Sequence, residues 1–286
     1  MTGPAAVVVG VDGSDPAADA ARWAAAHAAR HHLAVRLVRA YRLPPSAAAG
    51  RDRLRELARR QLWAAARAAH AVHPGLVVEQ LDEEGDPFDV LLAESGRAQT
   101  LAVGARGVGG VPALLAGSVG EALTREARCP VAVVRGHIGT DEELRGNGGT
   151  RPVVVGIDGS PASEAAVAFA FAEADACAAP LVAVHAWPDR AEESGIPFHY
   201  FTERAAEERE VLAERLAGWA EKYPGVRVSP ELVRGGAARV LLDRSRAARS
   251  VVVGSLGRAA VARALLGSTG RTLMRHASCP VVVTRP

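Results

Sequence analysis

Short apolar runs rich in valine alternate along this chain with longer amphipathic or alanine-rich segments. The first run, at residues 5–11, is continuous, which is typical of a strand buried on both faces of a parallel sheet. An alanine-rich segment from Pro16 to about His31 follows and predicts a helix that begins at a Ser or Asp cap. The rest of the first half predicts strands at 33–41, 76–81, 100–103 and 131–135 and helices at 51–73, 85–98 and 117–127.

The second half repeats this order. It predicts strands at 153–157, 181–187, 226–233, 250–253 and 281–284 and helices at 162–178, 202–222, 237–246 and 267–276. Strands that alternate with helices indicate an α/β fold with a parallel sheet. Five strands in each half favour the doubly wound order 3-2-1-4-5 with helices on both faces. Because strands 1 and 4 are then neighbours whose crossovers leave to opposite faces, we expect a ligand site at their carboxyl ends.

The two halves are also similar residue by residue. The sequence AVVVGVDGSD near the start returns as PVVVGIDGSP at 152–161, and REARCPVAVVRG at 125–136 returns as RHASCPVVVTRP at 275–286. The chain is therefore a tandem duplication. We expect one domain at 1–136, a second at 151–286, and a linker at 137–150, which is rich in glycine and charge and has no apolar periodicity.

Composition excludes several classes of protein. The net charge is +2 and no basic stripe is present, so nucleic-acid binding is not favoured. The start of the chain lacks the pattern of a secretory signal, and no apolar run approaches the ~18 residues of a membrane span. A cytoplasmic protein with no membrane partner is expected. Three widely spaced cysteines form no metal pair, and Cys129 and Cys279 occupy the same position of each repeat, which favours small buried residues.

Two glycine-containing stretches follow the fourth strand of each repeat, with identical spacing. Their fixed positions are Gly104, Gly107, Gly117 and Ser118 in the first repeat and Gly254, Gly257, Gly267 and Ser268 in the second. Glycine lets backbone amides approach an anion, and a helix N-terminus offers unpaired N–H groups. The pattern predicts a phosphate cradle in each repeat. The alternative is that the glycines only end the strands.

An aspartate follows the first strand of each repeat, at the same switch point. Asp12 and Asp158 are suited to accept hydrogen bonds from a ribose hydroxyl or a base amine. A second reading is that they cap the helices that follow.

These features together resemble the ATP-binding signature of the universal stress protein family. The shared elements are an aspartate at the end of the first strand, G-x2-G-x9-G-[ST], the turns VDGS and IDGS, and the CPV ending. The resemblance spans the chain outside the linker and is to the tandem two-domain members. It implies two Rossmann-like (adenine nucleotide alpha hydrolase-like) domains that bind ATP with Mg²⁺. It also implies pairing through the last strands, an internal pseudo-dimer that a homodimer could double, and a protein partner of unknown identity.

The resemblance carries further contacts onto this chain. Backbone groups at the end of the second strand would meet the adenine, at Ala40 and Ala186. The first repeat differs from the second in having Arg106, which is placed to face phosphate. The residue after Gly-Ser would offer a second hydroxyl to phosphate; Thr269 matches this pattern, whereas Val119 does not.

The expected function is a cytosolic, nucleotide-dependent regulator of the stress response. The alternative is a slow ATPase or an adenylyl- or phosphoryl-transfer enzyme on the same fold. No G-x4-GK[ST] loop is present, the first repeat has no lysine, and no catalytic residue is identified, so we expect slow turnover at most. An NAD-dependent oxidoreductase needs G-x-G-x-x-G after the first strand, where this chain reads GVDGS.

The histidines suggest no metal site at this level. His27 and His31 have the i, i+4 spacing that a metal could bridge, but the sequence shows no third ligand and no HExxH pattern, so a solvated helix face is predicted. The same prediction applies to His70 and His73. His185 lies on a strand and is predicted to be a hydrogen-bonded core residue.

Overall fold

A computed structural model describes residues 6–42, 50–106, 118–146, 151–187, 198–255 and 267–286. In the first half it contains β1 (Ala6–Gly10), α1 (Asp15–Arg30), β2 (Ala34–Tyr41), α2 (Arg51–Val72), β3 (Val78–Glu84), α3 (Pro87–Ser95), β4 (Ala98–Gly104), α4 (Ser118–Glu126) and β5 (Val131–Val134). The second half contains β6 (Val153–Ile157), α6 (Pro161–Ala176), β7 (Leu181–Trp187), α8 (Phe198–Lys222), β8 (Val228–Arg234), α9 (Ala237–Ser245), β9 (Ser250–Gly254), α10 (Ser268–His276) and β10 (Val281–Thr284).

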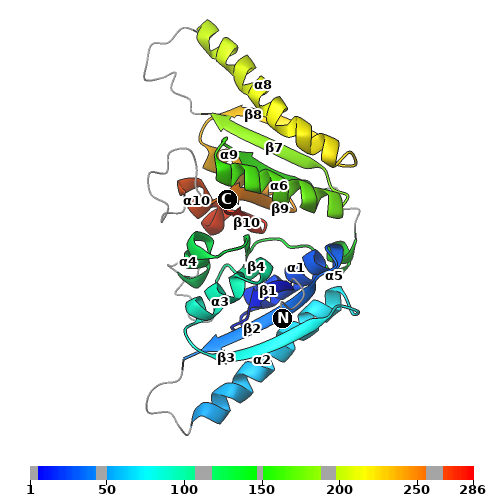
Figure 1. Cartoon of the computed structure of the whole chain (residues 1–286), viewed down its shortest axis with the longest axis vertical. Helices are drawn as coiled ribbons and strands as arrows, with labels where there is room; N and C mark the ends of the chain where they lie inside the picture. The colour runs from blue at the N-terminus through cyan, green and yellow to red at the C-terminus, as the bar shows by residue number, and fades with distance from the viewer. Residues whose placement is uncertain (1–5, 43–49, 107–117, 147–150, 188–197, 256–266) are drawn as a thin grey trace.

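All ten strands form one continuous sheet, in the order β3-β2-β1-β4-β5-β10-β9-β6-β7-β8. Neighbouring strands within each half are parallel, as the α/β prediction requires. The halves meet where β5 and β10 pair antiparallel, with Val131 opposite Val283 and Val133 opposite Val281. Figure 1 shows the two halves stacked end to end along the long axis, with this pair between them. The expected internal pseudo-dimer is therefore present.

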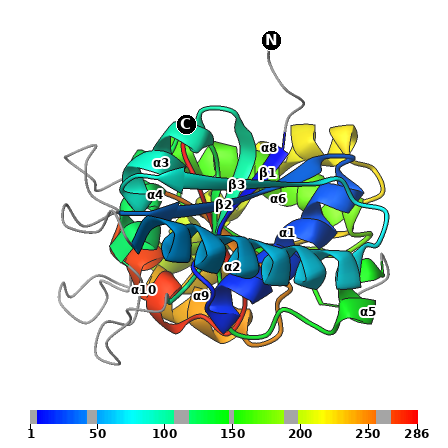
Figure 2. The same cartoon turned by 90° about the horizontal axis from the view of Figure 1, so that it is seen from below.

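Helices cover both faces of the sheet. The valines of β1 alternate between two apolar clusters, one on each face of the sheet: Val7 and Val9 belong to the cluster that includes residues of α1, α2, α6 and α8, and Val8 belongs to the cluster that includes residues of α3, α4, α9 and α10. Figure 2 shows α2 and α3 on opposite sides of β2 and β3. Since α1 follows β1 and α4 follows β4, the connections that leave these neighbouring strands go to opposite faces.

Small side chains let α1 lie close to the sheet. Ser14 caps the helix by accepting a hydrogen bond from the amide of Ala17, and Pro16 stands in the first turn. Four alanines that face the sheet are completely buried: Ala20, Ala21, Ala24 and Ala28. The helix ends before His32, which has a left-handed φ of 55°.

The segment predicted as a linker contains a short helix, α5 (Asp141–Arg145). Thr140 and Glu143 form a capping box at its start, with 3.2 Å between the Glu143 amide and the Thr140 Oγ1. Leu144 is 5% exposed and packs with Ala69 and Val72 of α2. Five residues are too few for an apolar period, so the Thr-x-x-Glu spacing at 140–143 is the signal in the sequence that could have indicated this helix.

Candidate functional site

The two predicted aspartates lie just beyond β1 and β6, where each orients the serine that caps the next helix. Asp12 Oδ1 accepts hydrogen bonds from the amide of Ser14 at 3.0 Å and from its Oγ at 2.6 Å. Asp158 Oδ1 accepts a hydrogen bond from the amide of Ser160 at 3.0 Å. The N-caps of α1 and α6 are the two serines. The aspartates are therefore not the helix caps themselves, and they affect capping only by orienting these serines.

Glycine is required in both of these turns. Gly13 has a φ of 86° and Gly159 a φ of 79°, values that other residues rarely adopt. A Cβ at Gly13 would lie 2.2 Å from Nε2 of Gln61, and one at Gly159 would lie 3.0 Å from the guanidinium of Arg215. Gln61 lies on α2 and Arg215 on α8, which are the long helices that follow the second strand of each repeat. These helices therefore contribute polar groups to the two switch points.

Gly104 and Gly254, the last residues of β4 and β9, lie against the first turn of a helix. A Cβ at Gly104 would stand 2.6 Å from the carbonyl carbon of Pro16, and one at Gly254 would stand 2.7 Å from that of Ala162. These backbone contacts leave no room for any side chain. Close helix packing thus explains both glycines without a ligand, which is a further alternative to the role in a phosphate cradle that the spacing predicts.

The structure brings the ends of β1 and β4 together. Ser14 Oγ, whose proton goes to Asp12, also lies 3.4 Å from the carbonyl oxygen of Arg106, so the Asp12 turn lies beside the residues after Gly104. The Arg106 side chain is exposed. Three predicted residues of the first repeat, Asp12, Gly104 and Arg106, therefore share one edge of the sheet.

The predicted phosphate-binding helices begin at Ser118 and Ser268, which are both exposed. In the second repeat the amide of Gly267 donates to the carbonyl of Ser255 at 3.0 Å, so the start of α10 lies beside the end of β9. The amide of Arg271 donates the first helical hydrogen bond, to the carbonyl of Gly267. The amides of residues 268–270, between Gly267 and Arg271, belong to the helix N-terminus, where the helix dipole favours an anion.

The residue after each of these serines differs between the repeats. Thr269 is half-buried at the start of α10, whereas Val119 packs against the apolar cluster beneath α4. Only the second repeat offers a hydroxyl here. The remaining predicted glycines, Gly107, Gly117 and Gly257, lie outside the described residues.

Arg39 and Gln61, which the sequence prediction missed, lie beside Asp12. Arg39 Nε donates to Gln61 Oε1 at 2.6 Å, and Gln61 Nε2 donates to the carbonyl of Asp12 at 2.9 Å. Burial lowers the pKa of the Arg39 guanidinium, and the nearby Asp12 opposes this shift. Arg39 also donates to the carbonyl of Ala40, one of the backbone groups predicted to meet an adenine.

His185 takes the place of Arg39 in the second repeat. It is 8% exposed, and its Nδ1 lies 2.8 Å from the carbonyl of Ile157, so the prediction of a hydrogen-bonded core residue is confirmed. Its Nε2 lies 3.2 Å from Glu208 of α8. Ala186, the predicted adenine contact, follows it and is half-buried. The difference between VRAY and VHAW was visible in the sequence, but the partners on α2 and α8 depend on how those helices lie against the strands.

The prediction of a solvated face at His27 and His31 is wrong. His27 is 1% exposed and His31 has 21% of its side chain exposed, because this face of α1 lies against Glu173 of the second repeat. A pattern within one repeat could not show that contact. His70 and His73 are exposed, as predicted.

Each of the three cysteines is buried and free. Burial raises the pKa of the Cys129, Cys177 and Cys279 thiols to about 12. The buried position predicted for Cys129 and Cys279, just before β5 and β10, is confirmed.

Among the helices that the structure describes, none has both the length and the apolar composition that a membrane span needs.

Comparison with known proteins identifies the fold and the family. A universal stress protein of Archaeoglobus fulgidus superposes with a TM-score of 0.73 at 19% identity, over 98% of this chain and 96% of that one. A second structure, described as a universal stress protein of Pseudomonas aeruginosa, superposes with a TM-score of 0.61 at 17% identity, over 98% and 92%.

Sequence relatives extend over nearly the whole chain. Universal stress protein Rv2623 of Mycobacterium tuberculosis is 38% identical over 304 residues, which cover 98% of this chain and 96% of the relative. A universal stress protein of Mycolicibacterium smegmatis is 36% identical over 293 residues, which cover 98% and 97%. The sequence profile of the universal stress protein family matches residues 5–135 and again 149–285. The chain therefore belongs to the universal stress protein family and carries two copies of the family's domain in tandem.

Proposed function

We propose that each repeat binds one ATP molecule together with Mg²⁺, and that the protein acts as a nucleotide-dependent regulator of a stress response. One observation supports this most. In both repeats an aspartate follows the first strand, and a serine-initiated helix follows the strand next to it. Doubly wound sheets bind ligands at this position, outside the carboxyl ends of the strands.

The phosphates would lie at the starts of α4 and α10. The helix amides and the hydroxyls of Ser118 and Ser268 are suited to phosphate oxygens, and Thr269 adds a hydroxyl in the second repeat. Arg106 adds an exposed positive charge in the first repeat. Mg²⁺ would be held by the phosphates and keep several waters, since this ion does not need a cage of protein ligands.

The nucleoside would lie beside Asp12 and Asp158. In the first repeat the adenine would compete with Arg39 for the carbonyl of Ala40. In the second repeat the side chain equivalent to Arg39 is His185, which lies on the carbonyl of Ile157 instead. An adenine at Ala186 would therefore meet a different side chain from an adenine at Ala40. We therefore expect the two sites to bind ATP with different affinities.

Paired variants test the first site. Removing the carboxylate in Asp12→Ala is expected to weaken ATP binding by at least about tenfold, measured by titration calorimetry with Mg²⁺, because hydrogen bonds to charged groups contribute about 1.5–3 kcal/mol. Ser14→Ala is the matched control. It removes the helix cap that Asp12 orients, at about 1 kcal/mol of stability, but keeps the carboxylate. Equal weakening by both variants would mean that Asp12 acts only through the cap.

A regulatory role requires ATP to stay bound without rapid hydrolysis. We expect turnover slower than about one ATP per minute, below the ordinary range of enzymes. A fast steady-state rate from clean protein would instead indicate an enzyme.

We also propose a homodimer. Because β5 and β10 already pair within one chain, a second chain would have to bind through another surface. Light scattering distinguishes the mass of one chain from that of two.

A further inference from the structure

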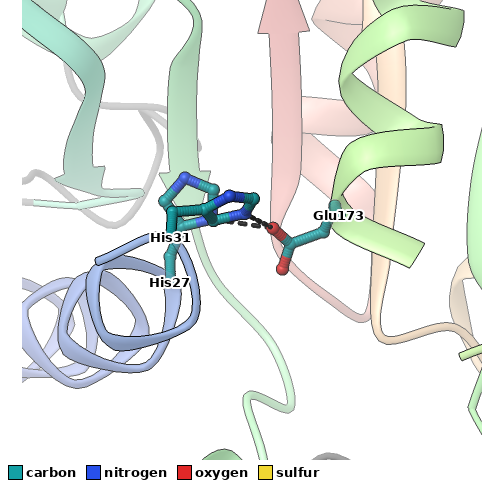
Figure 3. Close-up of side chains that lie close together, drawn as sticks. All are labelled: His27, His31 and Glu173. Atoms are coloured by element: carbon teal, nitrogen blue, oxygen red, sulfur yellow. Dashed lines mark hydrogen bonds and ion pairs between the residues drawn. The ribbon is translucent and has the colours of Figure 1, made fainter. Parts of the chain in front are cut away.

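A cluster of metal-ligand side chains lies between the two repeats, away from the candidate nucleotide sites. His27 and His31 come from α1 of the first repeat and face Glu173 of α6 in the second (Figure 3). Nδ1 of His27 lies 2.7 Å and Nε2 of His31 lies 3.2 Å from the same carboxylate oxygen, Oε2. The three ligand atoms all lie within 4.8 Å of one another.

The cluster is shielded from water. Glu173 is 4% exposed and His27 is 1% exposed. The ring of Trp23 stacks on His27 at 5.0 Å between centroids, and Phe169 of the second repeat stacks at 5.7 Å. A buried carboxylate in such surroundings needs opposite charge and hydrogen bonds.

The far nitrogen of His27 determines what its near nitrogen can do. Nε2 lies 3.2 Å from Oε1 of Gln99, an oxygen that also accepts a hydrogen bond from Thr100 Oγ1 at 2.5 Å. Because Gln99 Oε1 is an acceptor, the tautomer of His27 that donates from Nε2 leaves a lone pair on Nδ1, the atom that faces Glu173. The 2.7 Å between Nδ1 and Oε2 is a hydrogen-bond distance, so either a proton or a metal ion must bridge these two atoms.

The other carboxylate oxygen of Glu173 is held from behind. Cys177 Sγ donates to Oε1 at 3.3 Å, and the guanidinium of Arg30 lies 3.7 Å from it. Oε2 is thereby directed at the two histidines. Ligands in metal sites are oriented in this way, by hydrogen bonds to the atoms that do not face the ion.

We propose that His27, His31 and Glu173 bind one Zn²⁺ ion that joins the two repeats. Two imidazoles at i, i+4 on one helix face and a carboxylate form a ligand set that zinc prefers. The ion would replace the direct contact between Nδ1 and Oε2. The positive charge of Arg30 opposes a second cation nearby, so we expect an affinity in the micromolar range rather than a tighter one.

Zinc titration of the metal-stripped full chain against a chromophoric chelator tests the proposal. We expect one Zn²⁺ per chain and an unfolding temperature that rises until one equivalent is bound. His31→Gln removes the half-exposed ligand and leaves the buried pair of His27 and Glu173 intact. It is expected to weaken zinc binding by at least about tenfold. Circular dichroism checks that this variant is folded.

Two controls make the result specific. His32→Asn changes an exposed neighbour whose φ of 55° asparagine tolerates, and should bind zinc like the wild type. His70→Gln with His73→Gln removes the exposed pair at the end of α2 and should also leave binding unchanged.

Cobalt gives a second readout that needs no variant. Co²⁺ at this site is expected to show the intense visible bands of tetrahedral coordination. Weak octahedral bands, wild-type binding no tighter than that of His31→Gln, or binding lost with His70 and His73 would each overturn the proposal. His27 would then carry a second proton in place of the ion.

Discussion

Single glycines control how closely the helices approach the candidate nucleotide sites. Gly104 and Gly254, at the ends of β4 and β9, allow close contact with the backbone of α1 and α6, and Gly13 and Gly159 allow the tight turns that precede these two helices. These positions have a structural reason to be glycine that a motif alone does not reveal. Nucleotide affinity should therefore be tested by substituting side chains that are not needed for packing, and not by substituting these glycines.

Gly104→Ala is expected to lower stability even without nucleotide. The new Cβ would lie 2.6 Å from the backbone of Pro16, so the helix must move, at a cost of about 1–3 kcal/mol. Chemical denaturation measures the change. Gly218→Ala is the matched control because nothing lies within 4 Å of its added Cβ on α8, and it should stabilise the protein by about 0.5–1 kcal/mol. Similar effects of both variants would refute the packing explanation.

The buried cysteines should make stability fall at high pH. Burial raises the pKa of the Cys279 thiol from 9.0 to about 12, so the unfolded chain loses this proton first. This contribution to stability is complete below pH 9 and is lost as the pH rises toward 12. Denaturation at pH 8 and at about pH 10 should show a smaller fall in Cys279→Ala than in the wild type. An equal fall in both proteins would contradict the assignment.

At the scale of elements, the order of strands and helices follows from the sequence, but their contacts do not. Valine runs and alanine-rich segments predict β1 and α1 because periodicity reports which face is buried. The short helix α5 has no such period. The burial of His27 and the contact of Arg39 with Gln61 depend on tertiary placement, which no local pattern reports.

Leu144→Ala tests whether α5 is docked. Loss of the buried side chain is expected to weaken docking on α2 by about 2 kcal/mol, which is roughly a thirtyfold rise in the open fraction. Hydrogen exchange of residues 137–146 measures this directly. Glu142→Ala, at an exposed position of the same helix, should leave the exchange unchanged. Fast exchange in the wild type would show that α5 does not dock.

At the scale of the whole molecule, the two repeats form one folded unit. Beside the β5–β10 pair, Gly136 has a φ of 65°, and a Cβ there would lie 2.3 Å from the carbonyl oxygen of Ser278. The amide of His137 donates to that carbonyl at 2.8 Å. One apolar cluster includes Ala132 and Val282, so the core continues across the junction. Each repeat nevertheless keeps its own switch point, so we expect two nucleotide sites on one sheet.

Equilibrium dialysis of the full chain with radiolabelled ATP and Mg²⁺ tests this expectation most directly. We expect two ATP molecules per chain at a free ATP concentration that just fills both wild-type sites, fewer at that concentration in Asp12→Ala and in Asp158→Ala, and fewest when both are changed. Absence of saturable binding, or an amount of bound ATP that neither substitution lowers in folded protein, would contradict it.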